Sequence, residues 1–184
     1  LSVNFKSQII RAFFKEKKPN FNISFIEEKK PLGTMGPLSL IKDLPETFLV
    51  MNGDILTDLN YTNFLNKHSE TRHLFSISAT KREEPVDYGV LQAKDGRLTK
   101  MDEKPLNRYL VSMGVYAVNS SILDFIPKDK YFGFDILMAL LLKKKVEVGV
   151  IPHDGYWLDI GRPEDYMKAI DMVEQNFEFH FDNG

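Results

Sequence analysis

The chain has 184 residues, no cysteine, 24 basic and 26 acidic side chains, and a hydrophobic content of 43%. This length and composition predict one folded domain over residues 1–184 and exclude a disordered chain. The near balance of charge argues against a nucleic-acid partner. No apolar run approaches the ~20 residues of a membrane helix. The absence of cysteine excludes disulfides and, with no signal-peptide pattern, favours a cytoplasmic location.

Strand-like and helix-like segments alternate through the first half of the chain. Apolar residues at helical spacing predict helices, and short apolar runs between polar breaks predict strands. The predicted elements are a strand at 1–5, a helix at 7–16, a strand at 22–26, a Gly-containing loop at 32–37 leading into a helix that ends near Leu44, a strand at 47–51, a helix at 60–68 and a strand at 74–80. This order predicts a parallel sheet covered by helices.

The second half has a more mixed pattern. Its predicted elements are a hairpin over 88–101, a strand at 109–118, a short helix at 120–126, a helix at 134–145, strands at 146–151 and 157–160, and a final helix at 163–177. The hairpin adds an antiparallel component. The sequence therefore predicts an α/β fold whose mostly parallel sheet has an antiparallel extension.

One carboxylate follows a predicted strand and another lies within one. Asp54 comes after an apolar strand and an Asn-Gly dipeptide, and Asp159 lies between apolar residues near a Gly. Ligands of open α/β sheets gather outside the carboxyl ends of strands, where a carboxylate can hold Mg²⁺. Alternation would place Trp157 and Asp159 on one face. The alternative is that both aspartates only stabilise local turns.

Two further segments have residue types suited to ligand binding. In Glu103-Lys104-Pro105, the Glu can accept bonds from sugar hydroxyls and the Lys can pair with a phosphate. Pro105 biases Lys104 towards extended backbone, and the alternative is a solvated turn. Gly33, Thr34 and Gly36 permit close backbone approach to a flat or anionic ligand, although they match neither a Walker loop nor GxGxxG.

Six short motifs occur in a recognisable order. They are Leu32-Gly-Thr-Met-Gly-Pro-Leu38, Phe48-Leu-Val-Met-Asn-Gly-Asp54, Tyr88-Gly-Val-Leu91, Glu103-Lys-Pro105, Met113-Gly-Val-Tyr116 and Trp157-Leu-Asp-Ile-Gly-Arg-Pro-Glu-Asp-Tyr166. Together, over about residues 1–170, they resemble the sugar-1-phosphate nucleotidyltransferases, in particular the bacterial mannose-1-phosphate guanylyltransferase-like branch. The resemblance implies a Rossmann-like GT-A fold that here lacks the first strand and the glycine-rich loop.

The resemblance also implies a reaction and a set of site residues. The phosphate of a sugar 1-phosphate attacks the α-phosphorus of a nucleoside triphosphate, with GTP favoured, to give an NDP-sugar and pyrophosphate. Asp54 and Asp159 match the aspartates that hold Mg²⁺, and Lys104 matches the lysine that grips the sugar phosphate. Further sugar contacts fall on Gly89, Glu103, Ser112 and Trp157, and nucleotide contacts on Gly33, Thr34, Gly36 and Asn52.

Departures from the family pattern leave alternatives open. Without the glycine-rich loop, the chain as given is expected to bind nucleotide poorly and to be inactive alone. Ser112-Met113 replaces the usual Asn-Ala, and Met35 replaces a commoner alanine. One alternative is a non-catalytic sugar-nucleotide-binding or assembly subunit. A GT-A glycosyltransferase is a weaker one, because its Asp-x-Asp motif would need an acid at Asn52.

The resemblance has a consequence for folding. The absent first strand would lie near the middle of the sheet, beside residues 1–5. Unpaired strand edges and apolar surface promote association between chains. We therefore expect a homo-oligomer, strand-exchanged self-association or low stability.

Overall fold

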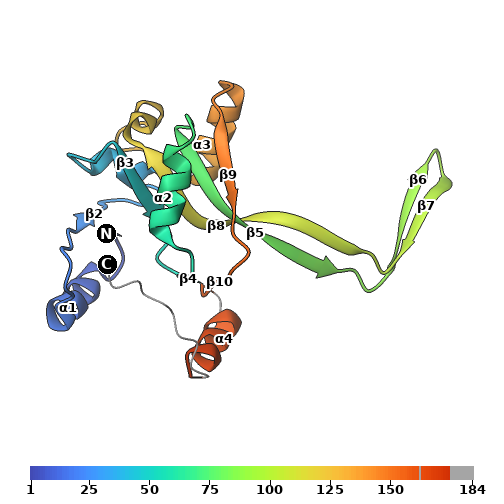
Figure 1. Cartoon of the computed structure of the whole chain (residues 1–184), viewed down its shortest axis with the longest axis horizontal. Coiled ribbons are helices and arrows are strands. Elements are labelled where there is room, and N and C mark those ends of the chain that lie inside the picture. Colours follow the sequence, from blue (N-terminus) through green and yellow to red (C-terminus); the bar gives the residue numbers. More distant parts are fainter. Residues whose placement is uncertain (162, 175–184) are drawn as a thin grey trace.

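The computed structural model describes residues 1–161 and 163–174. Its central sheet has the order β3-β8-β5-β9, formed by β3 (Thr47–Met51), β8 (Leu106–Asn119), β5 (Phe75–Pro85) and β9 (Val148–Pro152) (Figure 1). The α/β prediction is confirmed, and three of these strands share one direction. The reversed strand, β8, lies inside the sheet rather than at an extension, because the chain returns through a hairpin directly alongside β5.

The centre of β8 is the part of the sheet that is buried on both faces. Tyr116 and Val118 pack into a core with α3 (Phe134–Lys143), and Val115 and Ala117 pack against Phe64 of α2 (Tyr61–Ser69). Successive strand residues point to opposite faces, so one strand contributes to both cores. The sequence assigned such burial to 47–51, but β3 lies at an edge of the described sheet and its Met51 is exposed.

Residues 2–27 form a smaller unit beside this sheet. β1 (Ser2–Val3) pairs in parallel with β2 (Ile26–Glu27), and α1 (Ser7–Lys17) connects them. The helix predicted to end near Leu44 is only the 3-10 helix η1 (Gly36–Leu40), which ends where Ile41 turns extended. A second 3-10 helix, η2 (Ser120–Phe125), follows β8.

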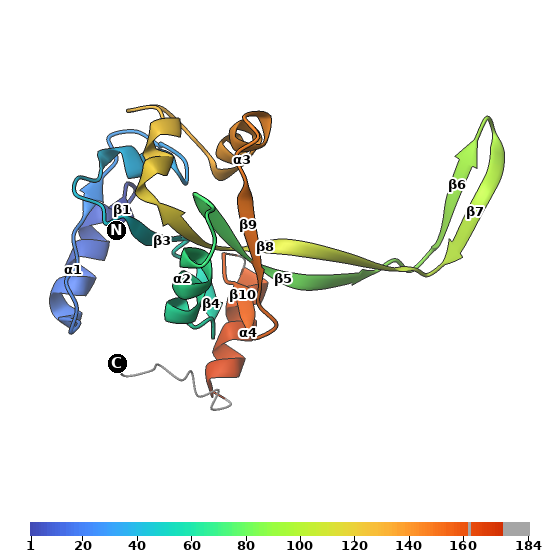
Figure 2. The same cartoon turned by 45° about the horizontal axis from the view of Figure 1, so that its top comes forward.

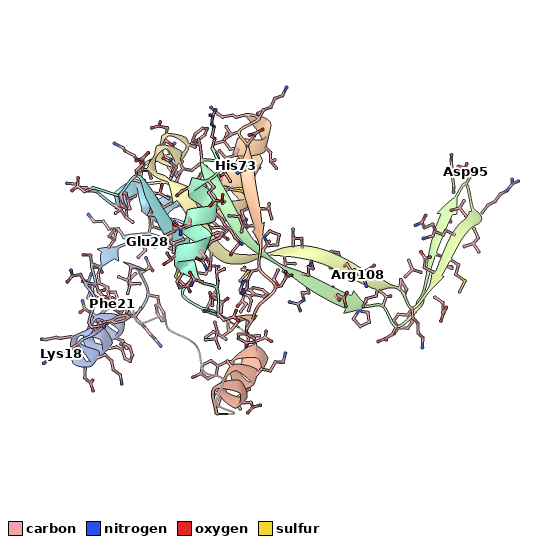
Figure 3. The ribbon with its side chains drawn as sticks, viewed as in Figure 1. Lys18, Phe21, Glu28, His73, Asp95 and Arg108 are labelled. Carbon is pink, nitrogen blue, oxygen red and sulfur yellow. The ribbon has the colours of Figure 1, made fainter. Side chains whose placement is uncertain are left out.

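Beyond the central sheet, β5 and β8 continue as a two-stranded arm. The arm ends in the hairpin of β6 (Gly89–Lys94) and β7 (Arg97–Glu103), which confirms the predicted hairpin. Figures 1 and 2 both show this hairpin far from the body, and Figure 3 places Arg108 along the arm and Asp95 at its tip. Every residue of β6 is exposed, so the arm packs on little of its own chain.

A short antiparallel ladder lies near the base of the arm (Figure 1). It joins β4 (Ile55–Thr57) to β10 (Trp157–Asp159), and α4 (Pro163–Glu174) follows it. The last predicted helical residues, beyond 174, lie outside the described residues. None of the helices in the described ranges has the length and apolarity needed to cross a bilayer.

Candidate functional site

The β4–β10 ladder brings together Asp54 and Asp159. Asp159 is paired with Ile55, and the Ile160 N–H donates to the Asp54 carbonyl at 2.8 Å. A Cβ placed on Gly161 would lie 3.0 Å from Asp54 Oδ2 and 3.1 Å from Asp159 Oδ1. Both side chains are exposed. Two carboxylates far apart in sequence therefore converge on one point that is open to solvent.

Among the described residues, no basic side chain is paired with these two carboxylates. Within the described ranges, no lysine or arginine forms a salt bridge with either carboxylate, and the Gly161 N–H donates to Asp159 Oδ1 at 2.9 Å. The described residues also contain no group of three or more histidine or acidic ligands for a metal. Paired carboxylate oxygens are the donors that Mg²⁺ takes when substrate phosphates and water complete its shell.

A glycine in β8 allows the loop of Asp54 to lie close to the sheet. Gly114 has a φ of +73°, and a Cβ there would lie 2.5 Å from Ile55 Cδ1 and 2.9 Å from Asn52 Nδ2. The Asn52 N–H donates to the Gly114 carbonyl at 3.0 Å. A side chain at 114 would therefore displace the segment that carries the first aspartate.

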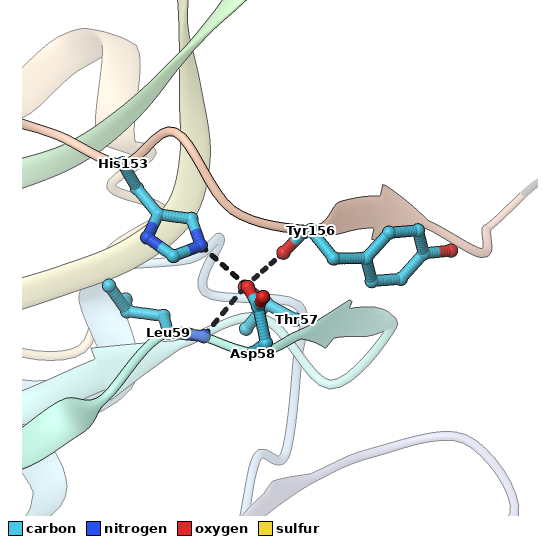
Figure 4. Close-up of polar contacts among 5 residues, drawn as sticks. All are labelled: Thr57, Asp58, Leu59, His153 and Tyr156. Atoms are coloured by element: carbon cyan, nitrogen blue, oxygen red, sulfur yellow. Dashed lines mark hydrogen bonds and ion pairs between the residues drawn. The ribbon is translucent and has the colours of Figure 1, made fainter. Parts of the chain in front are cut away.

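A set of polar contacts fixes the other end of the ladder (Figure 4). The Tyr156 carbonyl accepts from Thr57 Oγ1 at 2.7 Å and from the Asp58 N–H at 3.3 Å, and the Leu59 N–H donates to Thr57 Oγ1. Asp58 Oδ1 lies 2.7 Å from His153 Nε2. Sequence reasoning missed β4 and these contacts, because both depend on pairing with the distant segment of β10.

Trp157 and Ser112 are held by hydrogen bonds within the body. Trp157 Nε1 donates to the Met113 carbonyl at 2.9 Å, which ties β10 to β8. Ser112 Oγ donates to Tyr116 Oη at 3.4 Å and accepts from the Gly114 N–H. Burial raises the pKa of Tyr116, and the hydrogen bond from Ser112 acts in the opposite direction. Both residues therefore support the backbone around the carboxylate pair.

The glycine segment at 33–36 approaches the protein's own backbone. The N–H groups of Met35 and Gly36 both donate to the Phe132 carbonyl at 3.0 Å, and Thr34 Oγ1 accepts from the Phe134 N–H. Met35, which replaces a commoner alanine of the family pattern, is fully buried in the core. The N–H groups of Met35 and Gly36 are thus already used for packing, and nucleotide contact by Gly33, Thr34 and Gly36 stays a prediction.

The hairpin residues lie away from the two carboxylates. Gly89 and Glu103 are cross-strand partners, and a Cβ on Gly89 would lie 3.0 Å from Glu103 Oε2. Lys104, between β7 and β8, has a φ of +46° rather than the extended backbone expected before Pro105. Figure 1 shows the hairpin at the opposite end of the arm from β4 and β10. The resemblance led us to expect Lys104 at the same site as Asp54 and Asp159. In the structure it lies away from both aspartates.

The sequence as a whole identifies the family. Residues 2–176 match the sequence profile described as Nucleotidyl transferase. The chain belongs to the Nucleotidyl transferase family. It is 34% identical over 183 residues to the mannose-1-phosphate guanylyltransferase catalytic subunit beta of Dictyostelium discoideum, and 32% identical over 194 residues to a mannose-1-phosphate guanyltransferase of Schizosaccharomyces pombe. The alignments cover 94% and 98% of this chain but 50% and 52% of those proteins, so the chain spans about half the length of the curated relatives it matches.

Solved structures agree with this assignment. HddC from Yersinia pseudotuberculosis superposes with a TM-score of 0.69 at 28% identity, over 94% of this chain and 77% of that one. HddC is also known complexed with GMP-PN, and that structure superposes with a TM-score of 0.68. A putative glucose-1-phosphate thymidylyltransferase from Bacillus anthracis, at 14% identity and a TM-score of 0.64, shares the fold. The predicted family and fold class are confirmed.

In this member of the Nucleotidyl transferase family, the predicted site residues therefore lie in two separate parts of the structure. The body positions Asp54, Asp159 and Trp157 around the β4–β10 ladder. The arm holds Gly89, Glu103 and the adjoining Lys104. The second part can reach the first only if the arm changes its position.

Proposed function

We propose that this protein takes part in nucleotidyl transfer from a nucleoside triphosphate to a sugar 1-phosphate, with GTP and mannose 1-phosphate the favoured pair. The observation that carries the proposal is the convergence of Asp54 and Asp159 at Gly161. The names of the relatives, which are mannose-1-phosphate guanylyltransferases, and the GMP-PN complex of HddC support the choice of substrates.

The reaction requires mainly that the protein positions the two substrates and neutralises charge on the phosphoryl oxygens. A phosphate oxygen of the sugar 1-phosphate attacks the α-phosphorus in line with the leaving pyrophosphate. When bound by Asp54 and Asp159, Mg²⁺ would neutralise charge on the phosphoryl oxygens. The two exposed carboxylates, with no basic partner among the described residues, fit this ion because Mg²⁺ commonly binds through one or two carboxylates.

The surrounding residues keep the two carboxylates in place before substrate binds. The Gly161 N–H orients Asp159, and the Trp157 indole anchors the strand that carries it. Asn52 fixes the loop of Asp54 through Gly114. Such preorganisation lowers the reorganisation needed during reaction. Contacts of Lys104 and Glu103 with the sugar phosphate are proposed for a conformation in which the arm approaches β10.

A second candidate function is a non-catalytic sugar-nucleotide-binding or assembly subunit. It is favoured by the engagement of the Met35 and Gly36 N–H groups with Phe132, and by the distance of the hairpin from the carboxylates.

We also propose a cytoplasmic location, from the cysteine-free composition. Self-association is proposed from the edge position of β3 and the exposed apolar residues of the arm, and light scattering tests it.

A pyrophosphate-release assay on the full-length gene product, with Mg²⁺ and a matrix of triphosphates and sugar 1-phosphates, tests the main proposal. We expect Asp54→Asn and Asp159→Asn each to lower kcat by about 1000-fold, because each removes a ligand of the charge-neutralising ion. Asp95→Asn, at the hairpin tip, is the control and should leave kcat unchanged. If no substrate pair releases pyrophosphate, the result favours the non-catalytic subunit. Full activity in both site variants would refute the carboxylate site.

A further inference from the structure

The β4–β10 ladder is too short to hold its own position. It consists of three residue pairs, and its two strands form a sheet separate from the central one. Two-stranded ladders of this kind are marginally stable in water by themselves. Asp54 and Asp159 lie at one end of this ladder. The distance between the two carboxylates therefore depends on the contacts that attach the ladder to the body.

One such contact lies at the opposite end of the ladder, between Asp58 and His153 (Figure 4). His153 Nε2 is 2.7 Å from Asp58 Oδ1, and the histidine side chain is only 16% exposed. The His153 N–H donates to the Ala79 carbonyl of β5 at 2.8 Å. His153 therefore connects the two sheets, because its main chain is bonded to the central sheet and its side chain to the segment that follows β4.

The loop before β10 packs directly on this hydrogen bond. A Cβ on Gly155 would lie 2.5 Å from Asp58 Oδ1 and 2.6 Å from His153 Nε2. The backbone at 155 thus covers both atoms of the contact. Partial burial and a carboxylate acceptor make such a bond stronger than an exposed ion pair. The position of the loop that leads into β10 is therefore set by the Asp58–His153 contact.

The contact does not require a charged histidine. The carboxylate of Asp58 accepts, so His153 must carry a proton on Nε2. Both the imidazolium and the neutral imidazole with its proton on Nε2 provide this donor. The contribution of the pair is therefore one of geometry, which an amide donor can reproduce.

We propose that Asp58 and His153 are a positioning pair. Their hydrogen bond fixes the separation of Asp54 and Asp159, and thereby the affinity of the two carboxylates for a divalent ion, although neither residue binds the ion. The proposal rests on the proposed function and deepens it, because it names two residues that the family resemblance does not assign. It requires that a change at one end of the ladder alters the other end.

The first test needs neither a metal nor turnover. The Ile160 N–H donates to the Asp54 carbonyl at 2.8 Å, so its hydrogen exchange in the full-length protein, followed by NMR, reports on the carboxylate end. His153→Ala should speed this exchange about fivefold, the scale of one lost hydrogen bond. His153→Gln should restore most of the protection, because its amide donates in place of Nε2. His68→Ala, which removes a bond of equal length to Ser76 in the body, is the control and should leave the rate unchanged.

The second test measures metal affinity, with Mn²⁺ titrated into the same variants. His153→Ala and Asp58→Ala should each weaken Mn²⁺ binding about fivefold, and the double variant should be no worse than either, because both remove one contact. Asp58→Asn should keep most of the affinity, since its Oδ1 still accepts. The His68→Ala control should bind Mn²⁺ as the wild type does.

The outcomes separate this proposal from the proposed function. Unchanged exchange of the Ile160 amide in His153→Ala would overturn the positioning pair. An equal loss of Mn²⁺ affinity in Asp58→Asn and Asp58→Ala, with His153→Ala unaffected, would also overturn it and make Asp58 a ligand of the ion. Faster exchange in His153→Ala, in a protein whose wild type releases no pyrophosphate, would support the positioning pair and refute the proposed reaction.

Discussion

The body and the arm are built from the same two strands but differ in what surrounds them. At the sheet, residues 113–118 of β8 are all buried, whereas residues 108–110 of the same strand are exposed on the arm. β5 changes in the same way, from the apolar start at Phe75 to the charged run at 81–84. The stability of each part of a strand therefore depends on what packs against that part. Only the part of β5 and β8 within the body has a core that can hold a site rigidly.

The largest expected effect is a difference in stability between core and arm substitutions. Phe75 is 0% exposed and its ring packs against Tyr116 and Phe134, whereas Leu98 on the hairpin is 62% exposed. We expect Phe75→Ala to lower the free energy of unfolding by about 3–5 kcal/mol. Leu98→Ala should change it by less than about 0.5 kcal/mol. Urea unfolding measures both, and equal losses would mean that the arm is buried in solution.

Two glycines with positive φ, one in the body and one in the arm, differ in the space around them. Gly114 of the body has φ +73° and close neighbours, whereas Gly96 of the hairpin turn has φ +75° and open space. Gly96→Ala should destabilise only through its backbone conformation, by about 1 kcal/mol. Gly114→Ala should cost about 2–3 kcal/mol, because it also collides with Ile55 and Asn52.

Activity distinguishes the same two glycines. Gly114→Ala should also reduce turnover, since it displaces the loop of Asp54, and Gly96→Ala should not. Thermal unfolding and pyrophosphate release measure the two effects. Full activity in Gly114→Ala would show that the loop position is not needed.

The smallest expected effect is a pH dependence that belongs to the body. His68 is buried, its Nδ1 lies 2.7 Å from Ser76 Oγ, and burial followed by the nearby His73 lowers its pKa below 6.5. Below pH 6.5 the unfolded chain therefore binds more protons than the folded one. Stability from this group is present above pH 6.5 and is lost as pH falls through the folded pKa.

A substitution isolates the contribution of that histidine. His68→Gln should reduce the slope of unfolding free energy against pH between 5 and 7. The arm residues 80–111 contain no histidine, so the hairpin signals in an NMR titration should change little over that range. An unchanged slope in His68→Gln would contradict the assignment.

The sequence predicted the elements that carry a clear period. α1, α2, β3 and the β6–β7 hairpin lie close to their predicted positions, because amphipathic spacing and turn residues are local signals. β4 and the direction of β8 inside the sheet were not predicted, since they depend on long-range pairing. The motifs indicated Asp54 and Asp159, which the ladder brings together. They did not indicate that Lys104 lies on a projecting arm, because the length over which β5 and β8 remain paired is set by the tertiary fold.

The central claim is that Asp54 and Asp159 form one site for a divalent ion. Electron paramagnetic resonance of Mn²⁺, titrated into the full-length protein with GTP present, tests it without relying on turnover. We predict that Asp54→Asn and Asp159→Asn each weaken Mn²⁺ binding by at least about 10-fold, the scale expected when a carboxylate ligand is lost. The double variant should be little worse than either single one, because the two residues act on the same ion. Wild-type affinity in either single variant would contradict the claim.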